Sequence, residues 1–294
     1  AEVTESGTQF ALWAPSAQAV TLRLFTCGSQ QQTGDRLIES VAMQLQDDGA
    51  WTAAFDRNLD GVYYDFIVDF ADGASFRSAD PWARAAGING RRSMVVDLPR
   101  TNPEGWADDE RPRTPLSETM VWEAHVGSFS NNPHGGFPKE HQGKFLAFTD
   151  TQTSLDGDGT FPTGIAYLKR LGVTAVQLLP FYDYGSVDES DARQFNWGYD
   201  PLNYNVPEGS FSTDPYDGAV RITECKRMIQ SLHAAGFKVI MDVVYNHMYS
   251  ADNWFERTVP GYFMRRNEDG TLSNGSGCGD DMATEREMFR RFIV

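Results

Sequence analysis

Three polar side chains interrupt or close the otherwise apolar run MDVVYNH, residues 241–247: Asp242, Asn246 and His247. The apolar residues around them predict a strand that is buried on both faces. A buried carboxylate is costly unless a partner compensates its charge, so Asp242 needs a cation or a hydrogen-bond donor. These groups could line a polar site at the end of a strand. The alternative is a capped strand end with one hydrogen-bonded core histidine.

A second group of candidate residues lies in FNWGYDP, residues 195–201. Trp197 and Tyr199 offer flat apolar faces, which suit the C–H face of a sugar ring while hydroxyl groups find polar partners. Both rings could instead belong to the core. Asp200 is a weaker candidate, because an Asp before Pro201 is typical of a turn.

The elements predicted in the second part of the chain alternate between strands and amphipathic helices. This order predicts right-handed crossovers and a parallel sheet. A long insertion follows each strand, which favours a (β/α)8 TIM barrel over a doubly wound sheet, because barrel sites are built from such loops. Strands are predicted at 119–126, 174–182 and 237–246, and helices at 164–172, 219–236 and 284–294.

The first part of the chain, residues 1–98, has a different pattern of short runs that alternate apolar and polar residues. Gly, Asp and Pro separate these runs, as in an antiparallel β-sandwich. The segment 101–117 is rich in Pro and charge and reads as a linker. We therefore predict a β-sandwich module with its linker at 1–110 and a barrel portion at 111–294. The sandwich aromatics fall mostly on alternating positions, which favours core over sugar binding: Trp13, Trp51, Tyr63, Tyr64 and Phe66.

The composition restricts the partners of the protein. A net charge of −16 argues against nucleic acid, whose phosphates would be repelled. No apolar run approaches the roughly 18 residues that would span a membrane. The three cysteines, Cys27, Cys225 and Cys278, form neither a disulfide framework nor a zinc spacing. Without such a framework or a signal-peptide pattern, the cytoplasm is slightly favoured, although the compartment stays open.

A calcium site is the one metal site that the sequence raises. The loops are rich in Asp and Asn oxygens, but SLDGDG, residues 154–159, has only half of a calcium-loop spacing. A turn is favoured there. Neither a metal site nor a required cofactor is predicted, and calcium binding stays open.

Several segments together resemble the α-amylase superfamily, glycoside hydrolase family thirteen. DVVYNH is similar to the first short signature of that superfamily, and FNWGYDP resembles Tyr-Asn-Trp-Gly-Tyr-Asp-Pro of type I pullulanases, with Phe195 in place of the first Tyr. Two further segments, 176–189 and 202–215, also resemble type I pullulanases. Residues 80–98 resemble the end of the starch-binding-type module that precedes the barrel in debranching enzymes.

The resemblance implies roles for these residues in a retaining glycoside hydrolase. Tyr199 would stack under the sugar whose bond is cleaved, and His247 would hydrogen-bond that sugar. Asp242 would hold an Arg beside the nucleophile, and Asn246 would help to fix its loop. The candidates for substrate binding are thus Tyr199, Trp197, Asn246, His247 and Asp200, with Asp242 and His247 supporting catalysis.

The implied reaction is hydrolysis of α-1,6-glucosidic branch links in pullulan, starch or glycogen, with an α-glucan as the partner. One carboxylate attacks the anomeric carbon and a carboxylic acid protonates the leaving oxygen. The resemblance places both groups after later strands, so the remainder of a barrel is needed and residues 1–294 alone are expected to be inactive. The start at Ala1 and the end at Val294, inside a predicted helix, suggest a piece of a longer protein.

Two alternatives and two departures from the family pattern remain. The protein could be an isoamylase-type glycogen debranching enzyme, or a non-catalytic glucan-binding protein with a degenerate barrel.

HVGSFS, residues 125–130, stands where the family often has an Arg-Asp pair, so an ion pair is in doubt there. Residues 278–280, Cys-Gly-Asp, stand where Gly-Asn-Asp is expected, which leaves the ligand role of that loop open.

Overall fold

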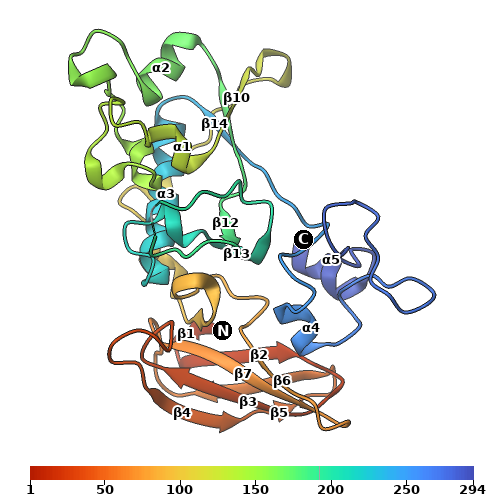
Figure 1. Cartoon of the computed structure of the whole chain (residues 1–294). Helices are drawn as coiled ribbons and strands as arrows, with labels where there is room; N and C mark the ends of the chain where they lie inside the picture. The colour runs from red at the N-terminus through yellow and green to blue at the C-terminus, as the bar shows by residue number, and fades with distance from the viewer. Residues whose placement is uncertain (192) are drawn as a thin grey trace.

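The computed structural model describes residues 1–191 and 193–294. Two antiparallel sheets form the β-sandwich at the N-terminal end of the molecule (Figure 1). One sheet has the order β1-β2-β6-β5, and the other has the order β4-β3-β7-β8 with β9 paired to β7. The strands are β1 (Glu2–Thr4), β2 (Gly7–Trp13), β3 (Ala17–Phe25), β4 (Leu37–Ala42), β5 (Gln44–Leu45), β6 (Ala50–Phe55), β7 (Tyr63–Phe70), β8 (Ser75–Ser78) and β9 (Ser93–Met94).

Alternate residues of these strands point between the two sheets, as the period of two requires. Phe10, Leu22 and Phe66 are almost fully buried there. The prediction that the sandwich aromatics are core residues is confirmed for Trp51, Tyr63, Tyr64 and Phe66, all buried. Trp13 is half-buried and instead packs edge-on against two rings of the C-terminal segment, Tyr262 at 5.0 Å and Phe263 at 6.0 Å.

The segment after the sandwich is not a free linker but lies along helix α3 (Gly218–Ala234). Lys226 donates to Thr101 Oγ1 at 2.7 Å, and the His233 ring lies 2.7 Å from Asp109. Short 3-10 turns shape the segment at Leu98–Thr101, Trp106–Asp108 and Leu116–Glu118. The segment that was read as a linker is therefore fixed to this helix by side-chain hydrogen bonds. The domain boundary near residue 110 stays a prediction.

Three parallel strands form the sheet of the second part: β10 (Val121–Ala124), β11 (Ala175–Leu178) and β14 (Lys238–Met241). The predicted strand–helix alternation is thus confirmed, with α2 (Gly164–Leu171) and α3 between the strands and no closed barrel among the described residues. Gly172 caps the C-terminal end of helix α2, and its φ of 83° is the left-handed conformation that glycine adopts readily. Figure 1 shows α3 beside this sheet.

All three predicted strands of the second part are shorter in the structure, at four residues each. Pro180 cannot donate to a strand ladder, and the chain leaves β11 after Leu178. It then forms β12 (Tyr182–Tyr184), which pairs antiparallel with β13 (Pro201–Pro207). Strand β14 ends at Met241, which pairs with Leu178, the last residue of β11, and the Asp242 amide then donates to the Leu178 carbonyl at 3.0 Å.

The expectation that residues 237–246 are buried on both faces is wrong. Met241 and Val243 are 40% and 42% exposed. Among the described residues, β14 has a neighbouring strand on one side only, which leaves these side chains uncovered.

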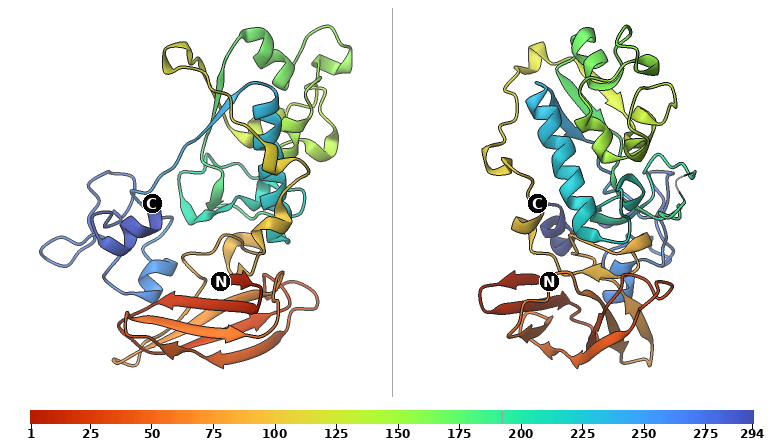
Figure 2. Two further views of the ribbon diagram at one scale, coloured as in Figure 1. Left: turned by 180° about the vertical axis from the view of Figure 1, so that it is seen from behind. Right: turned by 90° about the vertical axis from the view of Figure 1, so that its left-hand side faces the viewer.

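The C-terminal segment packs beside the sandwich (Figure 2). It contains α4 (Trp254–Thr258) and α5 (Glu287–Ile293), the latter within the predicted helix at 284–294. The Arg257 guanidinium donates to the Arg77 carbonyl of β8 at 3.0 Å. No helix in the described ranges 1–191 and 193–294 is both long and apolar enough to cross a membrane.

Candidate active site

The loop 195–199, which carries Trp197 and Tyr199, is held by a network of short hydrogen bonds. The Asp200 carboxylate accepts from the Ser186 amide at 3.0 Å and from the Asn196 side chain at 2.8 Å. Asn196 Oδ1 in turn accepts from the Gly198 amide at 2.8 Å. Asp200 therefore holds the loop through its carboxylate, and strand β13 rather than a turn begins at the next residue, Pro201.

The aromatic side chains of this loop are largely uncovered. Trp197 is 63% exposed and Phe195 59% exposed, while Tyr199 is half-buried. Tyr249, 43% exposed, lies against Gly185 next to the same loop, since a Cβ at Gly185 would meet its ring at 2.2 Å. Large aromatic surfaces that stay exposed together mark a binding site more often than a core.

Tyr199 and Asp242, predicted from separate segments, meet in the structure. The Tyr199 hydroxyl donates to Asp242 Oδ2 at 2.8 Å. Burial, together with this carboxylate, raises the pKa of Tyr199 to about 12, so the phenol stays protonated and the donor is maintained. Across 1–191 and 193–294, no cationic group forms an ion pair with Asp242. The role that the resemblance gives Asp242, holding an Arg, therefore stays a prediction.

His247 is brought to the same place, but its ring is engaged by the protein. It is only 6% exposed, and its Nε2 lies 2.7 Å from the Tyr199 carbonyl oxygen. Its Nδ1 is buried without a hydrogen-bond partner among the described residues. Asn246 has an exposed side chain and contributes its carbonyl, which accepts from the Met282 amide at 2.8 Å. Asn246 thus fixes the loop through the main chain, and sugar binding by either residue stays a proposal.

His125, which sequence analysis did not select, also contacts this loop. It follows β10 directly and caps helix α1 (Val126–Ser130), accepting at Nδ1 from the Ser128 amide at 3.0 Å. Its Nε2 lies 2.8 Å from the Asn196 carbonyl oxygen. Burial lowers the pKa of His125, which favours the neutral ring. Its position at the carboxyl end of a predicted strand was the available signal.

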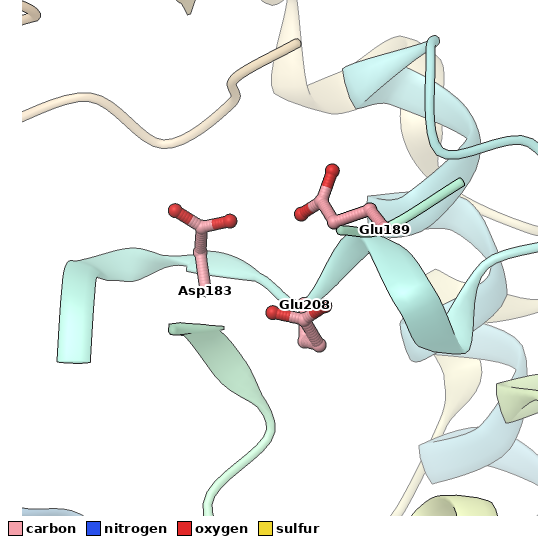
Figure 3. A group of neighbouring side chains, drawn as sticks. All are labelled: Asp183, Glu189 and Glu208. Carbon is pink, nitrogen blue, oxygen red and sulfur yellow. The ribbon is translucent and has the colours of Figure 1, made fainter. Parts of the chain in front are cut away.

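A buried cluster of three acids lies beside the site: Asp183 on β12, Glu189, and Glu208 at the end of β13. Figure 3 shows their side chains, and a carboxylate oxygen from each lies within 4.8 Å of the others. Arg221 of α3 pairs with Glu189 at 2.9 Å and faces Asp183 at 3.6 Å. A guanidinium therefore compensates charge where a bound cation would otherwise be needed.

Burial and mutual repulsion change the acidity of this cluster. Burial, with Glu189 and Glu208 nearby, raises the pKa of Asp183 well above its usual value. Burial and Glu189 raise the pKa of Glu208 to about 8. One guanidinium cannot balance three carboxylates, so part of the cluster stays protonated near neutral pH. Sequence analysis missed these acids because their positions, 183, 189 and 208, form no recognised motif.

The acid cluster also binds the segment that leaves the sandwich. The Asn89 amide donates to Glu189 Oε2 at 2.6 Å, and the Glu189 amide donates to Asn89 Oδ1 at 2.8 Å. Asn203 donates to the Gly90 carbonyl at 3.1 Å. Gly90 is required here, because its φ is 61° and a Cβ would lie 2.2 Å from Asp183 Oδ2. The cluster therefore joins the sandwich module to the loops of the parallel sheet.

The segment 154–159, considered for calcium, forms a turn. Leu155–Gly157 is a 3-10 turn, and Asp156 pairs with the exposed His134 at 2.6 Å. Cys278 is exposed and its amide donates to Ser276 Oγ at 3.3 Å. Calcium binding stays an open prediction, and so does the ligand role of the loop 278–280.

The stability of the protein should fall as the pH rises from about 4.5 to about 8. Glu208 binds a proton in the folded state up to a pKa of about 8, whereas an unfolded Glu releases it near its usual value of about 4.3. The folded state therefore holds more protons in this window and loses stability as they leave. Over this range, the fall in Tm should be smaller in the Glu208→Gln variant than in the wild type, by on the order of 5 °C. Thermal unfolding at pH 5, 6.5 and 8 measures this, and parallel curves would contradict it.

Two families match separate parts of the chain. Residues 1–83 match Carbohydrate-binding module 48 (Isoamylase N-terminal domain), and residues 146–269 match Alpha amylase, catalytic domain. With the parallel sheet and the loops at its strand ends, these matches define a protein of the α-amylase superfamily with an N-terminal carbohydrate-binding-type module.

Similar proteins narrow this class. Over 293 residues the chain is 36% identical to the pullulanase of Bacillus subtilis (strain 168), covering 99% of the chain and 39% of that protein. It superposes on the Paenibacillus barengoltzii pullulanase complexed with maltohexaose and α-cyclodextrin with a TM-score of 0.91 and 42% identity, covering 97% of the chain and 44% of that structure. A Haemophilus influenzae glycogen operon protein GlgX homolog is 30% identical over 98% of the chain and 44% of that protein. The chain belongs to the type I pullulanases, and it spans about two fifths of the length of the Bacillus relative.

Proposed function

We propose that the complete protein is a debranching glycoside hydrolase that cleaves α-1,6-glucosidic links in pullulan, branched starch or glycogen. The observation that carries this proposal is the exposed aromatic loop, with Trp197 and Tyr199, joined to Asp242 at the ends of parallel strands. The 36% identity to a pullulanase over nearly the whole chain supports the same reaction.

In this proposal, Tyr199 is the platform for the sugar at the cleaved bond. The hydrogen bond from its hydroxyl to Asp242 restricts the orientation of the ring, so that its face is prepared before the substrate binds. Asp242 is occupied by this donor and is not assigned the role of nucleophile. His247 is assigned to contact the same sugar, although its Nε2 faces the Tyr199 carbonyl in the unliganded structure.

The bond-breaking steps are assigned by family resemblance to two carboxyl groups in the remainder of the barrel. One attacks the anomeric carbon, and the other protonates the glycosidic oxygen and later activates water, which gives net retention. This chemistry requires no metal and no organic cofactor. In this assignment, Tyr199, Trp197 and His247 bind and orient the glucan and do not take part in the covalent step.

The test of the proposed function is hydrolysis by the complete protein of pullulan, glycogen and a linear α-1,4-glucan. Release of reducing ends from pullulan, with little from the linear glucan, is expected. Preference for glycogen over pullulan would favour the isoamylase-type alternative. Binding of pullulan without hydrolysis of any of the three would leave the non-catalytic glucan-binding alternative.

Removing the ring of Tyr199 should strongly impair the complete enzyme. We expect Tyr199→Ala to lower kcat/KM about 100-fold, or about 3 kcal/mol, because the stacking surface at the cleaved bond is lost. Tyr199→Phe keeps the ring and removes only the hydroxyl that donates to Asp242, so its loss should be at least about tenfold smaller. Steady-state kinetics on pullulan measure both variants. Wild-type kinetics in a folded Tyr199→Ala protein would contradict the stacking role.

A further inference from the structure

We propose that His125 is a positioning residue for the loop 195–199, which carries Trp197 and Tyr199. It touches neither of these two side chains through a hydrogen bond, and it acts through the backbone of Asn196. Its effect on catalysis rests on the proposed function, whereas its effect on the loop does not.

The hydrogen bonds of His125 determine which nitrogen carries the proton. The Ser128 backbone amide can only donate, and it points at Nδ1 from 3.0 Å, so Nδ1 is the unprotonated acceptor. A neutral imidazole then carries its hydrogen on Nε2, which lies 2.8 Å from the Asn196 carbonyl oxygen. The ring therefore donates to the loop 195–199 while it caps helix α1 with its other nitrogen.

Packing holds the imidazole in this orientation. The ring lies 4.8 Å from Phe195, a neighbour of Asn196, and 5.3 Å edge-on from the buried Phe211. Gly127 gives it room, because a Cβ there would lie 3.0 Å from the ring carbon Cε1. A donor whose ring is fixed in this way loses little freedom when it forms its hydrogen bond.

The loop is held at three strand ends, and His125 supplies the contact from β10. His247, beyond β14, places its Nε2 2.7 Å from the Tyr199 carbonyl. Gly198, between Asn196 and Tyr199 in the loop, packs closely against Pro180, which follows β11. A Cβ at Gly198 would lie 2.4 Å from the Pro180 carbonyl oxygen. Two imidazoles thus hold the backbone carbonyls of Asn196 and Tyr199 and set the places of Trp197 and Tyr199.

Two substitutions separate positioning from helix capping. His125→Asn keeps an acceptor near the place of Nδ1, and Asn is a favoured N-cap residue, but its side chain is too short to reach Asn196. His125→Gln carries an amide donor near the place of Nε2. His134→Asn makes the same change at an exposed histidine that pairs with Asp156 and serves as the control.

The readouts are amide hydrogen exchange and kcat/KM on pullulan, both in the complete protein. In His125→Asn, we expect the Gly198 amide, which donates to Asn196 Oδ1, to exchange about tenfold faster, with helix α1 unchanged. The same variant should lose about tenfold in kcat/KM, because the aromatic loop is misplaced. His125→Gln should recover both to within about threefold of wild type, and His134→Asn should match wild type.

The outcomes distinguish this inference from the proposed function. Unchanged exchange of the Gly198 amide in His125→Asn would overturn the positioning role. The role would also be overturned if exchange is faster in His125→Asn and equally fast in His125→Gln. If the wild-type protein hydrolyses none of the glucans while exchange changes as expected, the proposed function fails and the positioning of the loop by His125 is supported.

Discussion

Replacing Arg221 with Met should destabilise the protein by about 3–5 kcal/mol, the usual cost of removing one partner from a buried ion pair. Arg221 is fully buried and bonds to Glu189 at 2.9 Å and to the Pro215 carbonyl at 2.7 Å. Met fills similar volume but removes the guanidinium that pairs with Asp183 and Glu189. The expected drop in Tm is measurable by thermal unfolding of the complete protein at pH 7.

Controls show whether charge compensation is the cause. Arg227 lies exposed on the same helix, so Arg227→Met should change stability by less than about 0.5 kcal/mol. Adding Glu189→Gln to Arg221→Met removes one of the uncompensated acids and should recover part of the loss. A cost below about 1 kcal/mol for Arg221→Met would show that the acids are neutral in the folded protein and need no cation.

The parallel sheet and its helices could be predicted because their signals are local. The apolar stripe of α3 indicates which side of that helix faces the core. The glycine after α2 marks the end of that helix. The lengths of the strands could not be read in the same way. The last residue of β14, Met241, pairs with the last residue of β11, Leu178. The length of β14 therefore depends on a strand about 60 residues earlier in the chain, which the local sequence of β14 does not reveal.

The candidate site was predicted in part for the same reason. Tyr199 and Asp242 each stood in a recognisable local pattern, and the structure joins them. The charged linker shows the opposite case. Its composition indicated a linker but not its contacts, and in the structure Lys226 and His233 on α3 bind it. A polar residue looks the same in sequence whether water or a distant side chain satisfies it.

A purified polypeptide of residues 1–294 should hydrolyse neither pullulan nor glycogen. The resemblance places the nucleophile and the acid after a fourth and a fifth strand, whereas the described sheet has the three strands β10, β11 and β14. Their outer edges carry uncovered apolar side chains, with Val121 47% and Met241 40% exposed. Open strand edges with apolar surface favour association, so this polypeptide should also aggregate more readily than the complete protein.

Mixing residues 1–294 with the missing part of the barrel tests whether that part accounts for the lost activity. A separately produced polypeptide carrying the remainder of the barrel should cover the edges of β10 and β14, and activity should return only when the two pieces are mixed. Light scattering follows the aggregation, and release of reducing ends from pullulan follows the activity. Tyr199→Ala in the 1–294 piece is the matched control, because it should assemble normally and restore about 100-fold less activity. Turnover by residues 1–294 alone would mean that one of its own carboxylates is the nucleophile. Asp242, which already lies 2.8 Å from the Tyr199 hydroxyl, would then be the first residue to replace.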